Sequence, residues 1–321
     1  MTDREEITAE IAEEPVSELA AAPAGEVAEK KPHHKALKIV IVVLLEIALL
    51  GAGLFFGYTY AKSTIEPILI SNYRTLEDLR EYYRPSSADM NKDAAAFAAE
   101  ENYFGMYKRV YYALLTAPSV NVAGDGTTAT NGGTVSIDTV KKVENGLMYL
   151  HTVSTGTGLA GTFGGEFDLK QYFDIESQFA KVEKDGVIGK VQPEQTFVAK
   201  YGLLPYGFSN YTVEEETIDT AAYETADGLH VLTLTFLADA AENYLKQMKA
   251  YSGQIASFAD GDIQYKMFFD DGFVLRKTEV TEKYTVMSMP CTAELTDVYT
   301  YGGEDGYSPM EDAEKFSNVG A

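Results

Sequence analysis

The sequence is poor in the residues on which most catalytic and metal sites depend. Its 321 residues include no tryptophan, four histidines and one cysteine, Cys291. A lone cysteine forms no disulfide within its chain, and we interpret Cys291 as a small buried apolar residue and not as a reactive thiol. About 260 residues follow the N-terminal segment, and a domain of about that size buries enough surface to fold without disulfides or metal.

Candidates for catalysis are correspondingly few. Only His151 and His230 lie beyond residue 60, and strand alternation places His230 on an apolar face, which favours a core histidine over a general base. The sequence contains no G-x-S-x-G elbow, no complete calcium loop and no phosphate-binding loop. We therefore expect a protein that is not an enzyme and that needs neither a metal nor a cofactor.

Positive charge is scarce after residue 60. Residues 61–321 contain 39 acidic and 21 basic residues, a net charge of −18. Such a surface repels phosphate backbones, so we expect no nucleic-acid partner. Residues 1–38 are rich in Glu and Ala and contain no aromatic residue; they are predicted to form a disordered acidic tail that ends in a basic juxtamembrane cluster of Lys30, Lys31, Lys35 and Lys38.

Residues 39–60 are predicted to form a transmembrane helix. These 22 residues contain one charged side chain, and a helix of that length spans a hydrocarbon core of about 30 Å. The four lysines before the span and the single Lys62 just after it favour a cytoplasmic N-terminus. The sequence thus predicts a single-pass signal anchor in the cell membrane, with the C-terminal domain outside the cytoplasm.

Glu46 is the unusual residue of this span, because a carboxylate inside a bilayer costs a few kcal/mol. One interpretation is a contact with another membrane helix, aided by Gly53 and Gly57, which are spaced for close helix packing. The other is a protonated or snorkelling side chain that an apolar helix tolerates. The sequence leaves both open.

The remaining chain reads as helices followed by hairpins. Apolar residues spaced by three and four predict a helical stalk over 61–87 and a helix over 88–115, and a third helix is predicted near 239–251. Turn dipeptides at Asn145-Gly146, Asp185-Gly186, Asp227-Gly228 and Asp271-Gly272 predict four hairpins and about eight antiparallel strands. Two glycine-rich stretches, 124–133 and 156–165, are predicted as mobile loops, and 301–321 as an acidic tail.

This order predicts an α+β fold, in which two or three helices pack on one curved antiparallel sheet. The order, together with the phrases at 143–149, 171–174, 227–234 and 263–272, resembles the LolA-like group of bacterial envelope proteins, which includes lipoprotein carriers and LppX/LprG-type lipid-binding lipoproteins. The resemblance covers about residues 88–300, which we take as the extracytoplasmic domain. It implies a half-open barrel over helices with a cavity for acyl chains, and it transfers no individual site residue.

Our leading hypothesis is a domain that binds an apolar ligand, either a lipid or a lipoprotein acyl chain, between sheet and helices. Face alternation selects six candidate lining residues, for which an ordinary filled core is the alternative: Leu232, Leu234, Phe236, Tyr265, Met267 and Phe269. A second hypothesis is a protein-interaction or sensory module that meets a membrane or envelope protein partner.

Overall fold

The computed structural model describes residues 59, 62–158, 161, 166–201, 211, 213–251, 255–286 and 288–310. These residues belong to one compact unit, Gly53–Ala321. The predicted span 39–60, with Glu46, Gly53 and Gly57, lies outside the described residues except for Thr59. Among the helices that are described, none combines the length and the apolar character needed to cross a membrane.

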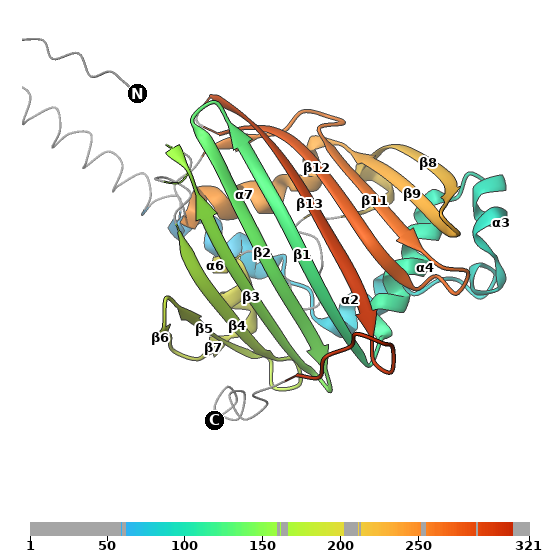
Figure 1. Ribbon diagram of the computed structural model, residues 1–321, viewed down its shortest axis with the longest axis horizontal. Helices are drawn as coiled ribbons and strands as arrows, with labels where there is room; N and C mark the ends of the chain where they lie inside the picture. The colour runs from blue at the N-terminus through green and yellow to red at the C-terminus, as the bar shows by residue number, and fades with distance from the viewer. Residues whose placement is uncertain are drawn as a thin grey trace, which may run out of the picture. The chain divides into compact units, whose positions relative to one another are not determined.

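A curved, open antiparallel sheet is the main element of the described chain (Figure 1). Its strands pair in the order β6-β5-β4-β3-β2-β1-β13-β12-β11-β9-β8, while β7 pairs with β5 and β10 with β12. The strands are β1 (Ser119–Thr130), β2 (Gly133–Glu144), β3 (Leu147–Gly156), β4 (Phe167–Asp174), β5 (Phe179–Lys184), β6 (Val187–Ile188), β7 (Gln192–Pro193), β8 (Ile218–Ala226), β9 (Leu229–Phe236), β10 (Ala256–Ser257), β11 (Ile263–Phe269), β12 (Leu275–Val286) and β13 (Met289–Tyr301).

The longer helices lie on one face of this sheet (Figure 1). Residues 62–71 are helical, and the helices that follow are α2 (Leu76–Tyr83), α3 (Ala94–Ala99), α4 (Tyr103–Thr116), α6 (Glu194–Tyr201) and α7 (Glu242–Tyr251), with three short 3-10 turns at η1 (Asp89–Asn91), η2 (Glu215–Thr217) and η3 (Ala238–Ala241). The predicted α+β class with a curved antiparallel sheet is confirmed.

The core lies between the helices and the sheet. Its larger cluster joins α2 and α4 to β1, β9, β11 and β12, and a smaller one joins Met148, Leu150, Phe173 and Val182 to Phe197 of α6. On α4, residues that recur at spacings of three and four are buried: Met106, Tyr107, Val110, Tyr111 and Leu114. This spacing turns one side of the helix toward the sheet.

The predicted count of about eight strands is wrong, because the described sheet has thirteen. All four predicted hairpins are present, as β2–β3, β5–β6, β8–β9 and β11–β12. The other five strands, β1, β4, β7, β10 and β13, do not adjoin any of the four turn dipeptides. The predicted count therefore left them out, and β1 was missed although Asn131-Gly132 joins it to β2, because these residues were assigned to a glycine-rich loop.

The fourth hairpin differs from the other three in its turn. Asn145, Asp185 and Asp227 have φ of 51°, 50° and 53° and precede glycines with φ of 78–79°, as a type I′ turn requires. In the β11–β12 connection the residue with positive φ is instead Phe273, at 62°. The Asp270 carboxylate organises this longer turn by accepting hydrogen bonds from the backbone N–H groups of Gly272 at 2.9 Å and Val274 at 3.1 Å.

Two further predictions about local structure are corrected. The glycine-rich stretch 124–133 is not a loop, because β1 runs through Thr130 and pairs with β2 on one side and β13 on the other; pairing on both sides outweighs the weak strand preference of glycine. The predicted helix 88–115 is broken. Glu101 has a φ of 54°, and the Asn102 side chain caps α4 by accepting from Gly105 N–H at 2.9 Å.

Candidate functional site

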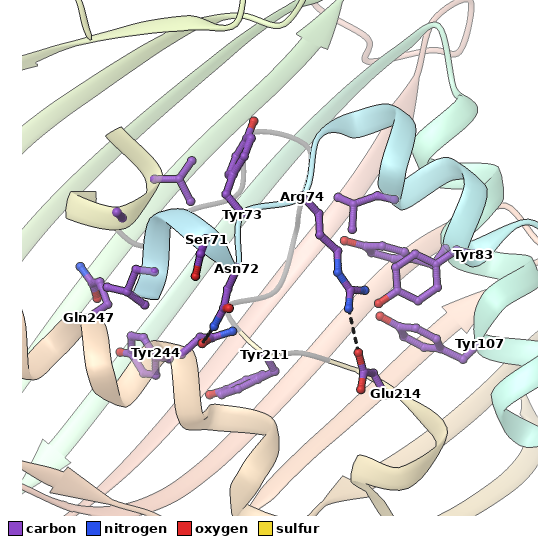
Figure 2. Close-up of a pocket in the computed structure, with 16 residues that line it drawn as sticks. Ser71, Asn72, Tyr73, Arg74, Tyr83, Tyr107, Tyr211, Glu214, Tyr244 and Gln247 are labelled. Atoms are coloured by element: carbon purple, nitrogen blue, oxygen red, sulfur yellow. Dashed lines mark hydrogen bonds and ion pairs between the residues drawn. The ribbon is translucent and has the colours of Figure 1, made fainter. Parts of the chain in front are cut away.

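The helices and the segments that connect them line a pocket of about 480 Å³. Its walls come from the helical segment 62–71 and the connection that follows it, from α2, α4, α6 and α7, and from Tyr211 and Glu214 (Figure 2). The lining residues are Leu69, Ser71, Asn72, Tyr73, Arg74, Leu79, Tyr83, Tyr107, Tyr111, Val198, Ala199, Tyr211, Glu214, Asn243, Tyr244 and Gln247.

Three tyrosines of α2 and α4 form the buried floor of the pocket. Tyr107 and Tyr111 stack with centroids 5.5 Å apart, and Tyr83 meets Tyr111 edge to face at 4.7 Å. Burial raises the pKa of Tyr83 and of Tyr107 far above the ordinary value of 10.0. Both phenols are therefore neutral at any physiological pH, and the Tyr83 hydroxyl donates to the Val213 carbonyl oxygen at 3.0 Å, so the floor offers mainly ring faces to a ligand.

A capping box places α2 so that it reaches this floor. The Asp78 N–H donates to the Thr75 hydroxyl at 3.2 Å, and the Thr75 N–H donates to the Asp78 carboxylate at 2.9 Å. The hydrogen bonds from Thr75 hold the pKa of Asp78 below its usual value. With the helix begun at Leu76, Leu79 and Tyr83 face the pocket from one side of α2, since residues three and four apart lie above one another.

Polar side chains at the rim are bonded to one another or to the backbone. Arg74 forms an ion pair with Glu214 at 3.0 Å (Figure 2), and the Asn72 side-chain amide donates to the side-chain oxygen Oδ1 of Asn243 at 3.0 Å. The Gln247 amide donates to the Lys200 carbonyl oxygen at 2.9 Å. These bonds satisfy much of the hydrogen-bonding capacity of the rim from within, which favours a ligand that demands few hydrogen bonds.

One wall of the pocket is tied to the sheet through a buried carboxyl group. The Tyr211 hydroxyl donates to Glu282 of β12, and Tyr211 also meets Tyr244 of α7 edge to face at 6.3 Å. Burial raises the pKa of Glu282, although the Tyr211 hydrogen bond opposes that shift. Burial also raises the pKa of Tyr244. This wall is thus aromatic and uncharged except at Glu282 behind it.

The six residues predicted to contact a ligand all lie in the larger core cluster: Leu232, Leu234, Phe236, Tyr265, Met267 and Phe269. Each has an exposed fraction of 3% or less, and none is among the residues that line the pocket described above. They thus occupy the positions expected of a filled core, and their role as ligand contacts stays a prediction.

Some of the pocket residues were predicted from the sequence, but as residues of packed helix faces and not as ligand contacts. Leu69, Tyr73, Leu79 and Tyr83 recur at helical spacing, as do Tyr107 and Tyr111 of α4, and this pattern predicts a packed helix face. The many tyrosines at these positions could have indicated a binding site, because a buried tyrosine hydroxyl group needs a hydrogen-bond partner that a fully apolar core lacks. Helix α6, which supplies Val198 and Ala199, had no predicted counterpart.

The histidines beyond residue 60 lie elsewhere. His151 pairs with Asp168 at 2.8 Å, and His230 contacts Asp271 at 2.9 Å and the Tyr223 hydroxyl at 2.8 Å. Neither histidine lines the pocket. Within the described residues, no group of three or more His, Cys, Asp or Glu side chains is arranged to hold a metal ion. The pocket is therefore equipped to bind a ligand through shape, ring faces and one ion pair.

The fold is an open, curved antiparallel sheet with its helices on one face, and similar solved structures exist. They include the lipoprotein LppX of Mycobacterium tuberculosis, at 11% identity, 65% of this chain, 100% of that chain and a TM-score of 0.35. They also include a DUF1329 family protein from Desulfovibrio piger, at 12% identity, 65% of this chain, 94% of that chain and a TM-score of 0.26.

A third similar structure is a domain from Vibrio parahaemolyticus whose provisional name is outer membrane lipoprotein-sorting protein, at 13% identity, 63% of this chain, 90% of that chain and a TM-score of 0.26. The structures that this chain resembles thus include members of the groups named by the sequence resemblance. Likeness at these TM-scores assigns no ligand to this chain. No protein-family model and no curated protein matches the sequence.

Proposed function

We propose that this protein is a membrane-anchored, non-enzymatic domain of the cell envelope that binds the apolar chain of a lipid or lipoprotein in the tyrosine-floored pocket. The observation that carries the proposal is the pocket itself. It has about 480 Å³ of space, within the range of about 300–1,000 Å³ typical of small-ligand sites. Its buried floor is aromatic, and much of its polar rim is already hydrogen-bonded.

The chemistry of the lining favours an apolar chain over a strongly polar ligand. Leu69, Leu79, Val198 and Ala199 supply aliphatic surface between the tyrosine rings. An acyl chain needs no hydrogen bond from the pocket, so it can fill the space below the rim without breaking the Asn72–Asn243 bond. Apolar pockets with a few placed polar groups are typical of sites that orient an amphiphile.

The setting of this domain is part of the proposal. The span 39–60 anchors the chain, residues 1–38 lie in the cytoplasm, and the domain over 88–300 lies outside it as a half-open barrel. Residues 61–87 follow the span and include the segment 62–71 and α2, which line the pocket, and 301–321 form an acidic tail. Glu46, with Gly53 and Gly57, contacts another membrane helix. Because the chain is anchored, its ligand exchanges at the membrane surface where the domain is tethered, without long-range transport.

The proposal is tested by filling the pocket. Val198→Trp adds a large side chain at a partly buried wall position, so the variant is expected to carry little bound lipid. The full chain, purified in a neutral detergent and washed, is extracted with organic solvent, and the released lipids are measured by mass spectrometry. Wild-type protein is expected to release a defined lipid in stoichiometric amount. Equal lipid release from wild type and variant would refute the proposal.

A matched control separates pocket filling from the effect of an added indole. Val187→Trp places the same side chain at the 71% exposed end of β6, away from the lining residues. This variant is expected to retain the wild-type amount of lipid. Since the chain has no tryptophan of its own, the fluorescence of each variant also reports whether the new side chain is buried or in water.

A further inference from the structure

The Arg74–Glu214 ion pair stands at the rim of the pocket as its only charged lining residues in the part of the chain that is described. The guanidinium lies 3.0 Å from the carboxylate, and the two side chains are 39% and 31% exposed. Arg74 also lies over the Tyr82 ring, with its Cζ atom 4.8 Å from the ring centroid. Both charges are thus held in place beside the opening of a pocket whose floor is aromatic.

We infer that this pair is the head-group site of the pocket and that it selects amphiphiles with a zwitterionic head group. The inference rests on the proposed function and specifies its ligand class. The anionic part of the head group binds Arg74, the cationic part binds Glu214, and the chain enters the pocket below. A phosphate ester joined to a primary amine is the simplest chemistry of this kind.

Charge balance at the rim decides between head-group classes. An anionic head group that binds Arg74 lies beside the Glu214 carboxylate, and a cationic one that binds Glu214 lies beside the Arg74 guanidinium. Each arrangement places like charges together, which is unfavourable. A zwitterionic head group places its anionic part against Arg74 and its cationic part against Glu214. Each charge of the rim then has an opposite partner, so this class of head group fits the rim best.

The surrounding residues support that choice. Burial raises the pKa of the Tyr82 phenol, and the nearby carboxylates of Glu214 and Glu216 raise it further, so two carboxylates lie near this ring. The aromatic rings of Tyr82 and Tyr83 add a favourable surface for an ammonium group. Because a half-exposed ion pair contributes little to folding, its exchange for a ligand costs little stability.

The fold also permits the exchange. The connection 73–75 that carries Arg74 has no regular secondary structure. Glu214 is held through its backbone, since its N–H donates to the Thr217 hydroxyl at 3.0 Å and its carbonyl oxygen accepts from the same hydroxyl at 2.9 Å. The Glu214 side chain also takes part in the capping box at the start of η2, where it accepts from the Thr217 backbone N–H, so the turn fixes this carboxylate at the rim.

The test compares four probes that share one oleoyl or oleyl chain: lysophosphatidylethanolamine, lysophosphatidic acid, oleylamine and monoolein. Each displaces a fluorescent monoacylglycerol from the full chain in a neutral detergent. The zwitterionic probe is expected to bind about tenfold more tightly than monoolein, an amount in keeping with charge-assisted hydrogen bonds partly offset by loss of the internal pair. Lysophosphatidic acid and oleylamine are expected to bind more weakly than the zwitterion.

Variants assign the preference to the pair. Arg74→Gln and Glu214→Gln should each reduce the zwitterion to within about twofold of monoolein, with monoolein unchanged, and Arg74→Lys should retain most of the preference. The double exchange Arg74→Glu with Glu214→Arg should restore it, because both charges are again present. As a control, Arg84→Gln with Glu81→Gln removes a similar pair, at 3.2 Å and with 54% and 70% exposure, and should change nothing.

Three outcomes overturn the inference. If all four probes bind alike, the pair has no part in head-group selection. If lysophosphatidic acid binds most tightly and only Arg74→Gln weakens it, the site selects anions. If no probe displaces the fluorescent monoacylglycerol and Val198→Trp leaves its binding unchanged, the pocket does not bind chains at all, and the proposed function fails with the inference. The first two outcomes leave the proposed function standing.

Discussion

The Lys141 ammonium lies 3.4 Å from the Asp297 carboxylate on the helix-facing side of the sheet, and the two side chains are only 9% and 18% exposed. They meet across β1, because Lys141 belongs to β2 and Asp297 to β13. Gly124 of β1 is paired directly with Asp297 and leaves the space that the pair occupies. This cluster explains a glycine in the middle of a long strand.

Gly124→Ala is therefore expected to destabilise the domain. A methyl group there would overlap the Asp297 carboxylate and the Thr139 hydroxyl, and overpacking of this kind costs about 1–3 kcal/mol in the free energy of unfolding. Urea unfolding followed by circular dichroism measures the loss. Thr127→Ala, at an exposed position on the other face of β1, should change stability by no more than about 0.5 kcal/mol. Equal effects of the two changes would contradict this account of Gly124.

The ion pair itself should behave as a buried pair. Asp297→Ala leaves the Lys141 ammonium in its buried place without that carboxylate, and loss of one partner of such a pair costs about 3 kcal/mol. The double change Lys141→Met with Asp297→Leu removes both charges and should cost less than Asp297→Ala alone. A double variant less stable than the single one, measured by the same unfolding transitions, would show that the pair gives net stability.

Glu282 should make stability depend on pH in a defined direction. Burial raises its pKa in the folded protein above the ordinary value of 4.5, so the folded state binds more protons than the unfolded state between these two values. Stability due to Glu282 is therefore greatest below 4.5 and falls as pH rises through the folded pKa. Between pH 4.5 and the folded pKa of Glu282, the stability of Glu282→Gln relative to wild type should therefore increase with pH. Above that pKa the difference should stay constant.

The control for Glu282 is Glu279→Gln on the same strand, where the side chain is 37% exposed. Its stability should differ from that of wild type by no more than about 1 kcal/mol, because exposed ion pairs contribute little to stability. Unfolding transitions at several pH values measure both variants. A gain for Glu282→Gln that shrinks as pH rises would contradict the assigned direction.

Substitutions of the predicted contact residues in the sheet should affect stability, whereas substitutions of the pocket residues should affect ligand binding. Leu234 is fully buried in the larger core cluster, so Leu234→Ala should lower the free energy of unfolding by about 2–5 kcal/mol. Displacement of the fluorescent monoacylglycerol should be unchanged under conditions where the variant is folded. If ligand binding is weakened as much as in Val198→Trp, the ligand reaches the sheet as the sequence hypothesis held.

The predicted membrane span 39–60 can be tested by extraction of membranes. Full-length protein should stay in the membrane fraction after extraction at alkaline pH, and a chain without residues 39–60 should be released, because 22 mostly apolar residues partition into the bilayer. Accessibility of the domain to protease from outside the cytoplasmic membrane tests its orientation. Release of the full-length protein by alkaline extraction would contradict the anchor.

The sequence predicted the class of the fold because its signals are local. Asn145-Gly146, Asp185-Gly186 and Asp227-Gly228 require backbone conformations that few other dipeptides adopt, and all three form the expected hairpin turns. The strand β13 carries no such signal, and the Asn131-Gly132 turn after β1 lies in a stretch that was predicted as a loop. The pairing of β1 with β13 is set by contacts between residues more than 150 positions apart, such as Val120 with Tyr301, and local patterns do not encode these contacts.

The pocket was harder to predict than the fold for the same reason. Tyr83, Tyr107 and Tyr111 are at core spacing on their helices, and spacing alone does not reveal that the side chains of α6 and α7 leave space beside them. Arg74 and Glu214 are 140 residues apart, so no motif joins them. Only the packing of helices from distant parts of the chain makes the site.

The most direct test of the central claim is to locate a bound chain on the protein. A lysophosphatidylethanolamine with a photoreactive diazirine near the end of its acyl chain is irradiated with the full chain, and the modified residues are found by peptide mass spectrometry. Modification should fall on pocket residues such as Leu69, Tyr107 and Val198, and excess unlabelled lysophosphatidylethanolamine should suppress it. Modification confined to strands β9 and β11, or scattered over the surface and insensitive to competition, would contradict the claim that this pocket binds the chain.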